Sequence, residues 1–257
     1  MSVDPRAVVD AGAKLGTGVT VGPFSVIGAG VEIGDGTTIG PHVVIEGPTR
    51  IGRDNTIHSF SSLGIAPQDK KYAGEQTTLE IGDRNTIFQY CTISRGTPQD
   101  AGTTRIGNDN WIMAYVHIAH DCVVGDNVIL ANCATLAGHV HIDDWAILGG
   151  FAKMHQFCHV GTHAFCGMDC GVTRDVPPYV TVSGHPAEPH GINSEGLKRR
   201  GFTAAQIRTI KQAYRLLYRD GLKLDEARTR IEALAATHPE LAPFVPFFVR
   251  ATRSIVR

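Results

Sequence analysis

Four histidines in the middle of the sequence could supply a general base: His117, His120, His139 and His155. An imidazole with its ordinary pKa of about 6.5 can accept a proton at neutral pH. Gly138 and Gln156 follow His120 at successive intervals of eighteen residues. A glycine stacked beside a base offers an unobstructed backbone N–H, which an oxyanion requires. These residue types therefore predict proton abstraction together with stabilisation of a negatively charged oxygen.

Asp121 directly follows His120 and could orient its imidazole. Adjacent residues on a strand point to opposite sides, so the orienting acid could instead come from elsewhere in the fold. The histidines could also be solvated side chains or hydrogen-bond partners between subunits. Their grouping favours a catalytic role over these alternatives.

The elements that position these residues are indicated by an apolar residue at every sixth position. The pattern runs from Val9 to Leu63, from Ile81 to Ile93 and from Ile106 to Val172. A period of six suits short strands joined by tight corners, three to a coil, and the anchors fill about eight coils. Residues eighteen apart then stack, which brings Gly138 next to His120. Glycines such as Gly22 are expected where a corner needs positive φ or close backbone approach.

Two segments, 64–80 and 94–105, interrupt the repeat, and such extrusions from a rigid scaffold are natural places for function. After Val172 the pattern changes to helices, predicted near 203–219, 225–236 and 242–255. We therefore expect a β-helix over residues 1–180 and a C-terminal helical domain over 181–257. The flat strand faces favour self-association, and a three-sided prism makes a homotrimer the simplest closure.

The composition excludes several classes of partner. Lys plus Arg number 24 and Asp plus Glu number 25, so the overall charge gives no reason to expect nucleic-acid binding. No apolar run approaches transmembrane length and the N-terminus lacks a signal-peptide pattern, which predicts a cytoplasmic protein without stable membrane insertion. Six cysteines without a CxxC pair are expected to be buried thiols.

Several sequence blocks closely resemble those of the UDP-N-acetylglucosamine O-acyltransferases of lipid A synthesis: Gln68 to Glu75, His117 to Cys122, Leu136 to Val140, His155 to Phe157, Asp175 to Val180 and Glu195 to Phe202. The likeness covers nearly the whole chain. It implies an all-β, left-handed parallel β-helix, whose hand is opposite to that of ordinary crossovers. It also implies transfer of a 3-hydroxyacyl chain from acyl carrier protein to the 3-hydroxyl of UDP-N-acetylglucosamine, the first step of lipid A biosynthesis, without a metal or cofactor.

The resemblance further implies residue roles. His120 matches the family's general base, Asp121 its supporting acid and Gly138 its oxyanion donor. The implied substrate-binding residues are Asp69, Lys71, His117, His139, His155, Gln156, Asn193, Glu195, Arg199 and Arg200. Paired arginines suit a diphosphate because each guanidinium can bind two oxygens.

Two residues depart from the family pattern. Ser94 stands where the family commonly has histidine, so one ligand contact is expected to be weaker or replaced by water. Met168 stands where several members have glycine at the end of the acyl groove. Because methionine fills volume that terminal methylenes would occupy, we expect a shorter, decanoyl-like chain. The groove must then lie between subunits, since Met168 and His120 fall on different faces.

The sequence is also compatible with other functions. A related N-acyltransferase carries an extra domain before its hexads, whereas the hexads here begin near Val9. A γ-carbonic-anhydrase-like β-helix would bind zinc through histidines at subunit edges, and a purely structural β-helix would show flat threonine ladders. A UDP-sugar with a 3-amino group could also be the acceptor. Acyl carrier protein is acidic and needs a basic surface, for which the candidates are Lys153, Lys198, Arg219 and Lys223.

Overall fold

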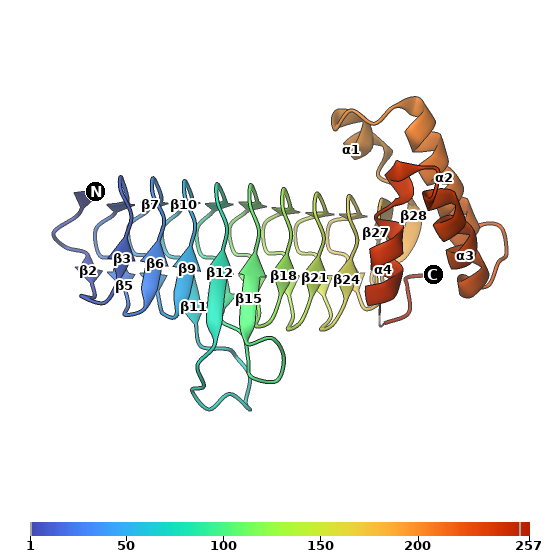
Figure 1. The fold of residues 1–257 in the computed structure, drawn as a ribbon. Helices are drawn as coiled ribbons and strands as arrows, with labels where there is room; N and C mark the ends of the chain where they lie inside the picture. Colours follow the sequence, from blue (N-terminus) through green and yellow to red (C-terminus); the bar gives the residue numbers. More distant parts are fainter. Residues whose placement is uncertain (1, 252) are drawn as a thin grey trace.

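The structure is a computed structural model that describes residues 2–251 and 253–257. Short parallel strands wind into a long three-sided prism, and a group of helices covers its C-terminal end (Figure 1). Within the described residues, no helix is both long enough and apolar enough to cross a membrane.

Three sheets form the sides of the prism, and we call them A, B and C. Sheet A contains β1 (Ser2–Val3), β4 (Thr20–Val21), β7 (Thr38–Ile39), β10 (Thr56–Ile57), β13 (Thr86–Ile87), β16 (Trp111–Ile112), β19 (Ile129–Leu130), β22 (Ile147–Leu148), β25 (Phe165–Cys166), β27 (Val180–Ser183) and β28 (Glu188–Ile192). Sheet B contains β2 (Val8–Val9), β5 (Val26–Ile27), β8 (Val44–Ile45), β11 (Ser62–Ile65), β14 (Thr92–Ser94), β17 (His117–Ile118), β20 (Thr135–Leu136), β23 (Lys153–Met154) and β26 (Gly171–Val172). Sheet C contains β3 (Lys14–Leu15), β6 (Val31–Ile33), β9 (Thr49–Ile51), β12 (Thr78–Ile81), β15 (Thr103–Ile106), β18 (Val123–Val124), β21 (His141–Ile142) and β24 (His159–Val160).

The six-residue period produces this prism because each anchor turns one apolar side chain inward. Ile45, Ile93 and Leu130 are fully buried in the shared core. Most strands pair in parallel at an offset of eighteen residues, as between His117 and Thr135. Across the two extrusions the offset is 30 residues, as between Thr56 and Thr86, or 25. The described strands make nine coils by the count of sheet B, one more than the anchors predicted.

The corners of the prism confirm one of the two reasons expected for Gly22, the close approach of the backbone. Gly22 does not have positive φ; a Cβ there would lie 2.7 Å from the carbonyl carbon of Gly40, so close backbone approach requires the glycine. The left-handed position falls two residues later and is usually not glycine, as at Phe24 with φ 61°. Asp121 and His139 occupy equivalent positions, with φ of 57° and 61°.

Both interruptions of the repeat project from the edge between sheets B and C. They comprise residues 66–77, between β11 and β12, and residues 95–102, between β14 and β15, and they lie side by side in Figure 1. Arg95 connects them, because its guanidinium donates to the carbonyl oxygen of Gly64 and to the Tyr72 hydroxyl. The two extrusions thus form one wall over this edge.

The C-terminal helices are α1 (Ser194–Arg199), α2 (Ala204–Tyr218), α3 (Leu224–Ala235), η1 (Pro239–Leu241) and α4 (Phe244–Arg250). The predicted capping box at Thr203 is confirmed. The predicted continuation of the last helix to 255 is wrong: α4 ends earlier, and Ile255 pairs with Asp175 of the prism. Thr252, within that predicted helix, lies outside the described residues. A domain boundary at 180 stays a prediction, since β27 and β28 extend sheet A beyond it.

Candidate active site

His120 and Asp121 form a hydrogen-bonded pair at the B–C edge. His120 Nδ1 lies 2.9 Å from Asp121 Oδ2. The two residues are consecutive, yet their side chains meet because Asp121 occupies a left-handed corner position instead of continuing a strand. A carboxylate can only accept, so the His120 Nδ1 carries the proton and Nε2 is free to act as a base.

The second extrusion holds Asp121 in place. Thr97 donates its backbone N–H to both carboxylate oxygens, at 3.0 Å each, and its hydroxyl to Oδ2 at 2.6 Å. The Asp121 backbone N–H donates in turn to Thr104 Oγ1. Asp121 is only 2% exposed, so these donors stabilise a carboxylate that water could not solvate.

His139 forms a second contact of the same kind. Its Nδ1 lies 2.8 Å from Asp100 Oδ2, and 4.0 Å from Asp121 Oδ2. Its ring meets the ring of His120 edge on, with centroids 5.0 Å apart. Ligand atoms of His120, Asp121 and His139 all lie within 4.8 Å of one another, so these three side chains could also hold a metal ion.

Gly138 lies directly beside His120, as the eighteen-residue stacking predicts. A Cβ at this position would come within 2.6 Å of His120 Cε1 and 2.8 Å of His120 Nε2. Within residues 2–251 and 253–257, no group accepts a hydrogen bond from the Gly138 N–H. The glycine therefore leaves both space and a free donor next to the His120 ring.

A cleft of about 790 Å³ opens over these residues. It is lined by Gln68, Asp69, Lys70, Lys71, Gln99, Asp100, His120, His139, Gln156 and Phe157. The structure thus brings the predicted residues Asp69, Lys71 and Gln156 into one cleft with His120. Sequence reasoning missed Gln99 and Asp100, although it singled out their segment, because a polar loop has no periodicity to show which side chains turn inward.

Two predicted histidines lie outside this cleft. His117 Nδ1 forms a hydrogen bond of 2.7 Å with Thr92 Oγ1 on the outer face of sheet B. Burial, and secondarily the charge of His120, lower the pKa of His117. His155 is exposed, and its Nδ1 contacts the carbonyl oxygen of Gln156. Ser94 is 1% exposed, and its hydroxyl has no partner among the described residues.

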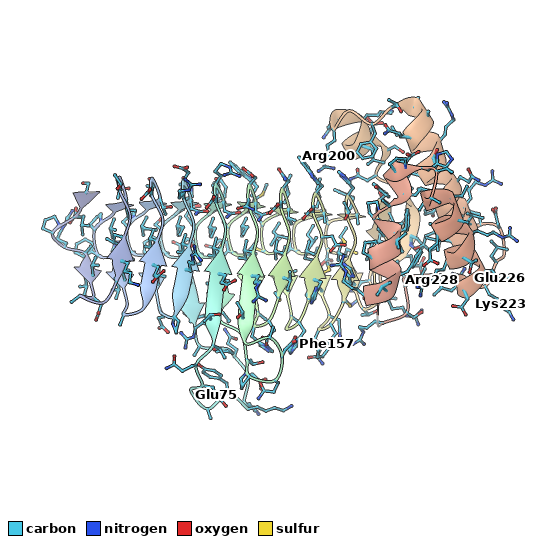
Figure 2. All side chains as sticks on the ribbon, viewed as in Figure 1. Glu75, Phe157, Arg200, Lys223, Glu226 and Arg228 are labelled. Carbon is cyan, nitrogen blue, oxygen red and sulfur yellow. The ribbon has the colours of Figure 1, made fainter. Side chains whose placement is uncertain are left out.

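The predicted substrate-binding residues Asn193, Glu195, Arg199 and Arg200 belong to a segment at another edge of the prism, between sheets C and A. Figure 2 shows Arg200 on one side and Phe157 on the other. Arg200 stacks over the Trp145 ring at 5.0 Å, and Asn193 caps α1 and donates to the His163 carbonyl. Burial, and secondarily Arg200, lower the pKa of His163 to about 4.

Glu195 and Arg199 complete this set of predicted substrate-binding residues, and both are more exposed than Arg200. Glu195 pairs with Lys198 at 2.7 Å, and Arg199 is exposed. Within one chain, the cleft at the B–C edge is therefore separate from these four predicted substrate-binding residues. Met168 is 77% exposed at the third edge, between sheets A and B.

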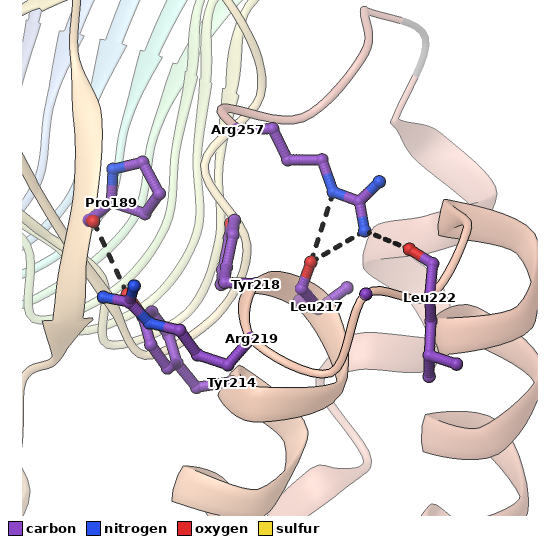
Figure 3. Close-up of a pocket in the computed structure, with 8 residues that line it drawn as sticks. Pro189, Tyr214, Leu217, Tyr218, Arg219, Leu222 and Arg257 are labelled. Atoms are coloured by element: carbon purple, nitrogen blue, oxygen red, sulfur yellow. Dashed lines mark hydrogen bonds between the residues drawn. The ribbon is translucent and has the colours of Figure 1, made fainter.

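A second pocket, of about 400 Å³, lies between α2, β28 and the C-terminus (Figure 3). Arg257 donates there to the carbonyl oxygens of Leu217, in the last turn of α2, and of Leu222, which follows the helix. It thereby satisfies acceptors that the end of the helix leaves unpaired. Arg219 lines the same pocket. Of the other basic candidates, Lys153 is paired with Asp169.

Five of the six cysteines are buried as predicted, and Cys133 is half-buried. Burial raises the pKa of the Cys91 thiol to about 11, which keeps it protonated.

Coils of short parallel strands built on a six-residue repeat define the hexapeptide-repeat class of transferases. The family model described as bacterial transferase hexapeptide matches residues 30–64 and 103–138. A model described as UDP N-acetylglucosamine O-acyltransferase, domain 2, matches residues 175–256. Two curated relatives are named acyl-[acyl-carrier-protein]–UDP-N-acetylglucosamine O-acyltransferase. The one from Thiobacillus denitrificans is 59% identical and covers 100% of this chain and 99% of its own. The one from Herminiimonas arsenicoxydans is 57% identical and covers 99% of each.

Solved structures agree. The UDP-N-acetylglucosamine acyltransferase of Francisella novicida has a TM-score of 0.97 at 44% identity, covering 99% of this chain and 94% of its own. The Moraxella catarrhalis UDP-N-acetylglucosamine O-acyltransferase has a TM-score of 0.97 at 43% identity, covering 100% of each chain. The chain therefore belongs to the UDP-N-acetylglucosamine O-acyltransferase family, and the left-handed β-helix that the sequence implied is confirmed.

Proposed function

We propose that the protein transfers a 3-hydroxyacyl chain from acyl carrier protein to the 3-hydroxyl of UDP-N-acetylglucosamine, the first step of lipid A biosynthesis, in the cytoplasm. The observation that carries this proposal is the His120–Asp121 pair, with Nδ1 and Oδ2 2.9 Å apart, beside the free N–H of Gly138. A base and an oxyanion donor side by side are what acyl transfer from a thioester needs.

The reaction would proceed in two steps. His120 Nε2 removes the proton of the sugar hydroxyl while its oxygen attacks the thioester carbonyl carbon, and the Gly138 N–H stabilises the resulting oxyanion. The oxyanion then collapses, the C–S bond breaks, and the imidazolium of His120 returns its proton to the leaving thiolate. Asp121 stabilises the imidazolium between the steps.

The assay that tests this function offers the purified protein 3-hydroxyacyl carrier protein with either UDP-N-acetylglucosamine or its 3-amino analogue. We expect acylation of the first acceptor. Acylation of the amine alone would overturn the proposed acceptor, because a base and an oxyanion hole also serve N-acylation. Stoichiometric zinc together with loss of transfer on chelation would favour the metal alternative at His120, Asp121 and His139.

We infer that the acceptor site is shared between subunits of a homotrimer. The outer face of sheet C carries ion pairs, such as Lys14–Glu32 at 2.6 Å and Arg105–Glu80 at 3.2 Å, which suit contact with water. The A–B edge instead exposes a series of aromatic rings: Phe24, Phe60, Tyr90, Tyr115 and Phe151. Packing sheet A of one copy against sheet B of the next covers these rings. It also brings the C–A edge, with Arg200, next to the neighbour's B–C edge, with His120.

Mixed trimers test this arrangement. Subunits with His120→Ala and subunits with Arg200→Ala are each expected to be nearly inactive alone. Random mixing should restore about a quarter of wild-type activity, because one site in a mixed trimer combines both intact residues. Size-exclusion chromatography of each variant checks that the oligomer forms. Mixtures that stay as inactive as their parents would contradict the shared site.

The same arrangement gives the acyl chain a path. A chain starting at the B–C edge would run between the packed sheets toward the A–B edge, where Met168 is exposed. Met168→Gly should therefore shift the preferred donor from a decanoyl-like to a longer 3-hydroxyacyl chain, since each added buried methylene contributes about 0.8 kcal/mol. Competition between donors of graded length, for wild type and variant, measures the shift. An unchanged preference would exclude Met168 as the residue that limits chain length.

A further inference from the structure

The second extrusion carries a carboxylate that no sequence motif singled out. Asp100 Oδ2 lies 2.8 Å from Nδ1 of His139. The Asp100 side chain is 48% exposed, whereas that of His139 is 13% exposed. A charged residue at the solvent side of the loop thus turns toward the cleft and contacts a nearly buried ring.

Packing fixes the plane of the His139 ring. Its backbone adopts the left-handed corner conformation, the ring stacks on Phe157 with centroids 4.4 Å apart and planes 10° apart, and it meets His120 at 88°. None of these contacts determines which ring nitrogen carries the proton. Asp100 does, because a carboxylate can only accept and so favours a proton on Nδ1.

We propose that Asp100 is a positioning residue that holds His139 in the Nδ1-protonated tautomer, so that Nε2 can accept a hydrogen bond from the acceptor sugar. The cleft then contains two imidazole–carboxylate pairs of different purpose. The His120–Asp121 pair moves the proton, and the His139–Asp100 pair recognises the ligand. The identity of the ligand rests on the proposed function, whereas the tautomer does not.

Asp121, the other carboxylate near His139, does not determine the tautomer of this ring. Asp121 Oδ2 lies 4.0 Å from His139 Nδ1, beyond hydrogen-bond distance, and is already bound by Thr97 and His120. Thr97 also anchors the extrusion to the prism without Asp100. The Asp100–His139 contact is therefore not needed to hold the loop, which leaves control of the His139 tautomer as its effect.

Nitrogen NMR of the histidine rings tests the tautomer without any substrate. Protein with ¹⁵N-labelled histidine is compared at mildly alkaline pH, and the His139 signals are identified by their loss in His139→Gln. We expect Nδ1–H in wild type, loss of that preference in Asp100→Ala, and its return in Asp100→Glu. Ala101→Ser, an exposed change on the same loop, should leave the spectrum unchanged. An Nε2–H tautomer in wild type, or one indifferent to Asp100→Ala, would overturn the proposal.

Kinetics test the consequence. Asp100→Ala should raise the KM for UDP-N-acetylglucosamine about tenfold and change kcat little, the scale expected for loss of a residue that orients a ligand contact. In a His139→Gln background the same change should have no further effect. Equal losses in both backgrounds would assign Asp100 a role in loop stability and contradict the proposal. If wild type fails to acylate UDP-N-acetylglucosamine at all, the proposed function fails, while the NMR result still decides the tautomer.

Discussion

Replacing His120 by glutamine is expected to lower kcat for acyl transfer by about a thousandfold, within the range that a general base contributes. The loss should fall on kcat, because glutamine keeps a polar side chain of similar reach but cannot accept the hydroxyl proton. Steady-state kinetics with saturating acyl carrier protein donor would measure kcat and the KM for the acceptor separately.

A matched control comes from His190, an exposed histidine on β28. His190→Gln makes the same chemical change away from the cleft and should leave kcat unchanged. Retention of full activity by His120→Gln would show that another group removes the proton. His139, whose ring lies 5.0 Å from that of His120, would then be the first residue to examine.

The Asp121→Asn protein is expected to lose a comparable factor in kcat, about a thousandfold, since an amide in place of the orienting acid favours the wrong tautomer of the base. Its NH₂ group would donate to His120 Nδ1 and move the imidazole proton to Nε2. The amide would also face the Thr97 N–H and hydroxyl, which now donate to the carboxylate. Unfolding free energy should therefore fall by about 1.5–3 kcal/mol, the scale of a hydrogen bond to a charged group.

Asp10→Asn separates these two effects. Asp10 lies at the B–C edge of the first coil, outside the cleft, and its Oδ1 accepts from the backbone N–H of Gly12 at 2.8 Å. This variant should keep its kcat, and urea denaturation of both proteins would compare their stability. If Asp121→Asn loses stability but not activity, Asp121 supports the fold alone.

Much of the fold followed from the sequence because a six-residue period constrains the chain strongly. One inward side chain per strand determines the phase of every coil, so the stacking of Gly138 on His120 could be predicted. The helix at Thr203 was equally well marked by its capping box. The last helix was predicted to be longer than it is, because the buried apolar residues near Ile255 pack against the prism instead of continuing the helix.

The candidate site was only partly predictable. Stacking and resemblance indicated His120, Asp69, Lys71 and Gln156, all of which line one cleft. No pattern indicated Asp100, and none showed that Arg200 lies at another edge. Loop residues and prism edges have no periodic relation to each other, so sequence spacing does not determine their distances.

The sequence by itself determined the repeat, its phase and the family, because an inward apolar residue at every sixth position leaves few alternative folds. Only the tertiary structure decided whether Asp121 could orient the preceding histidine. Strand geometry would have separated the two side chains, but a left-handed corner with φ 57° turns Asp121 back toward His120, and hydrogen bonds from Thr97, 24 residues earlier in the chain, hold it there. Such a contact depends on the backbone dihedral angle at one corner, which a sequence pattern does not specify.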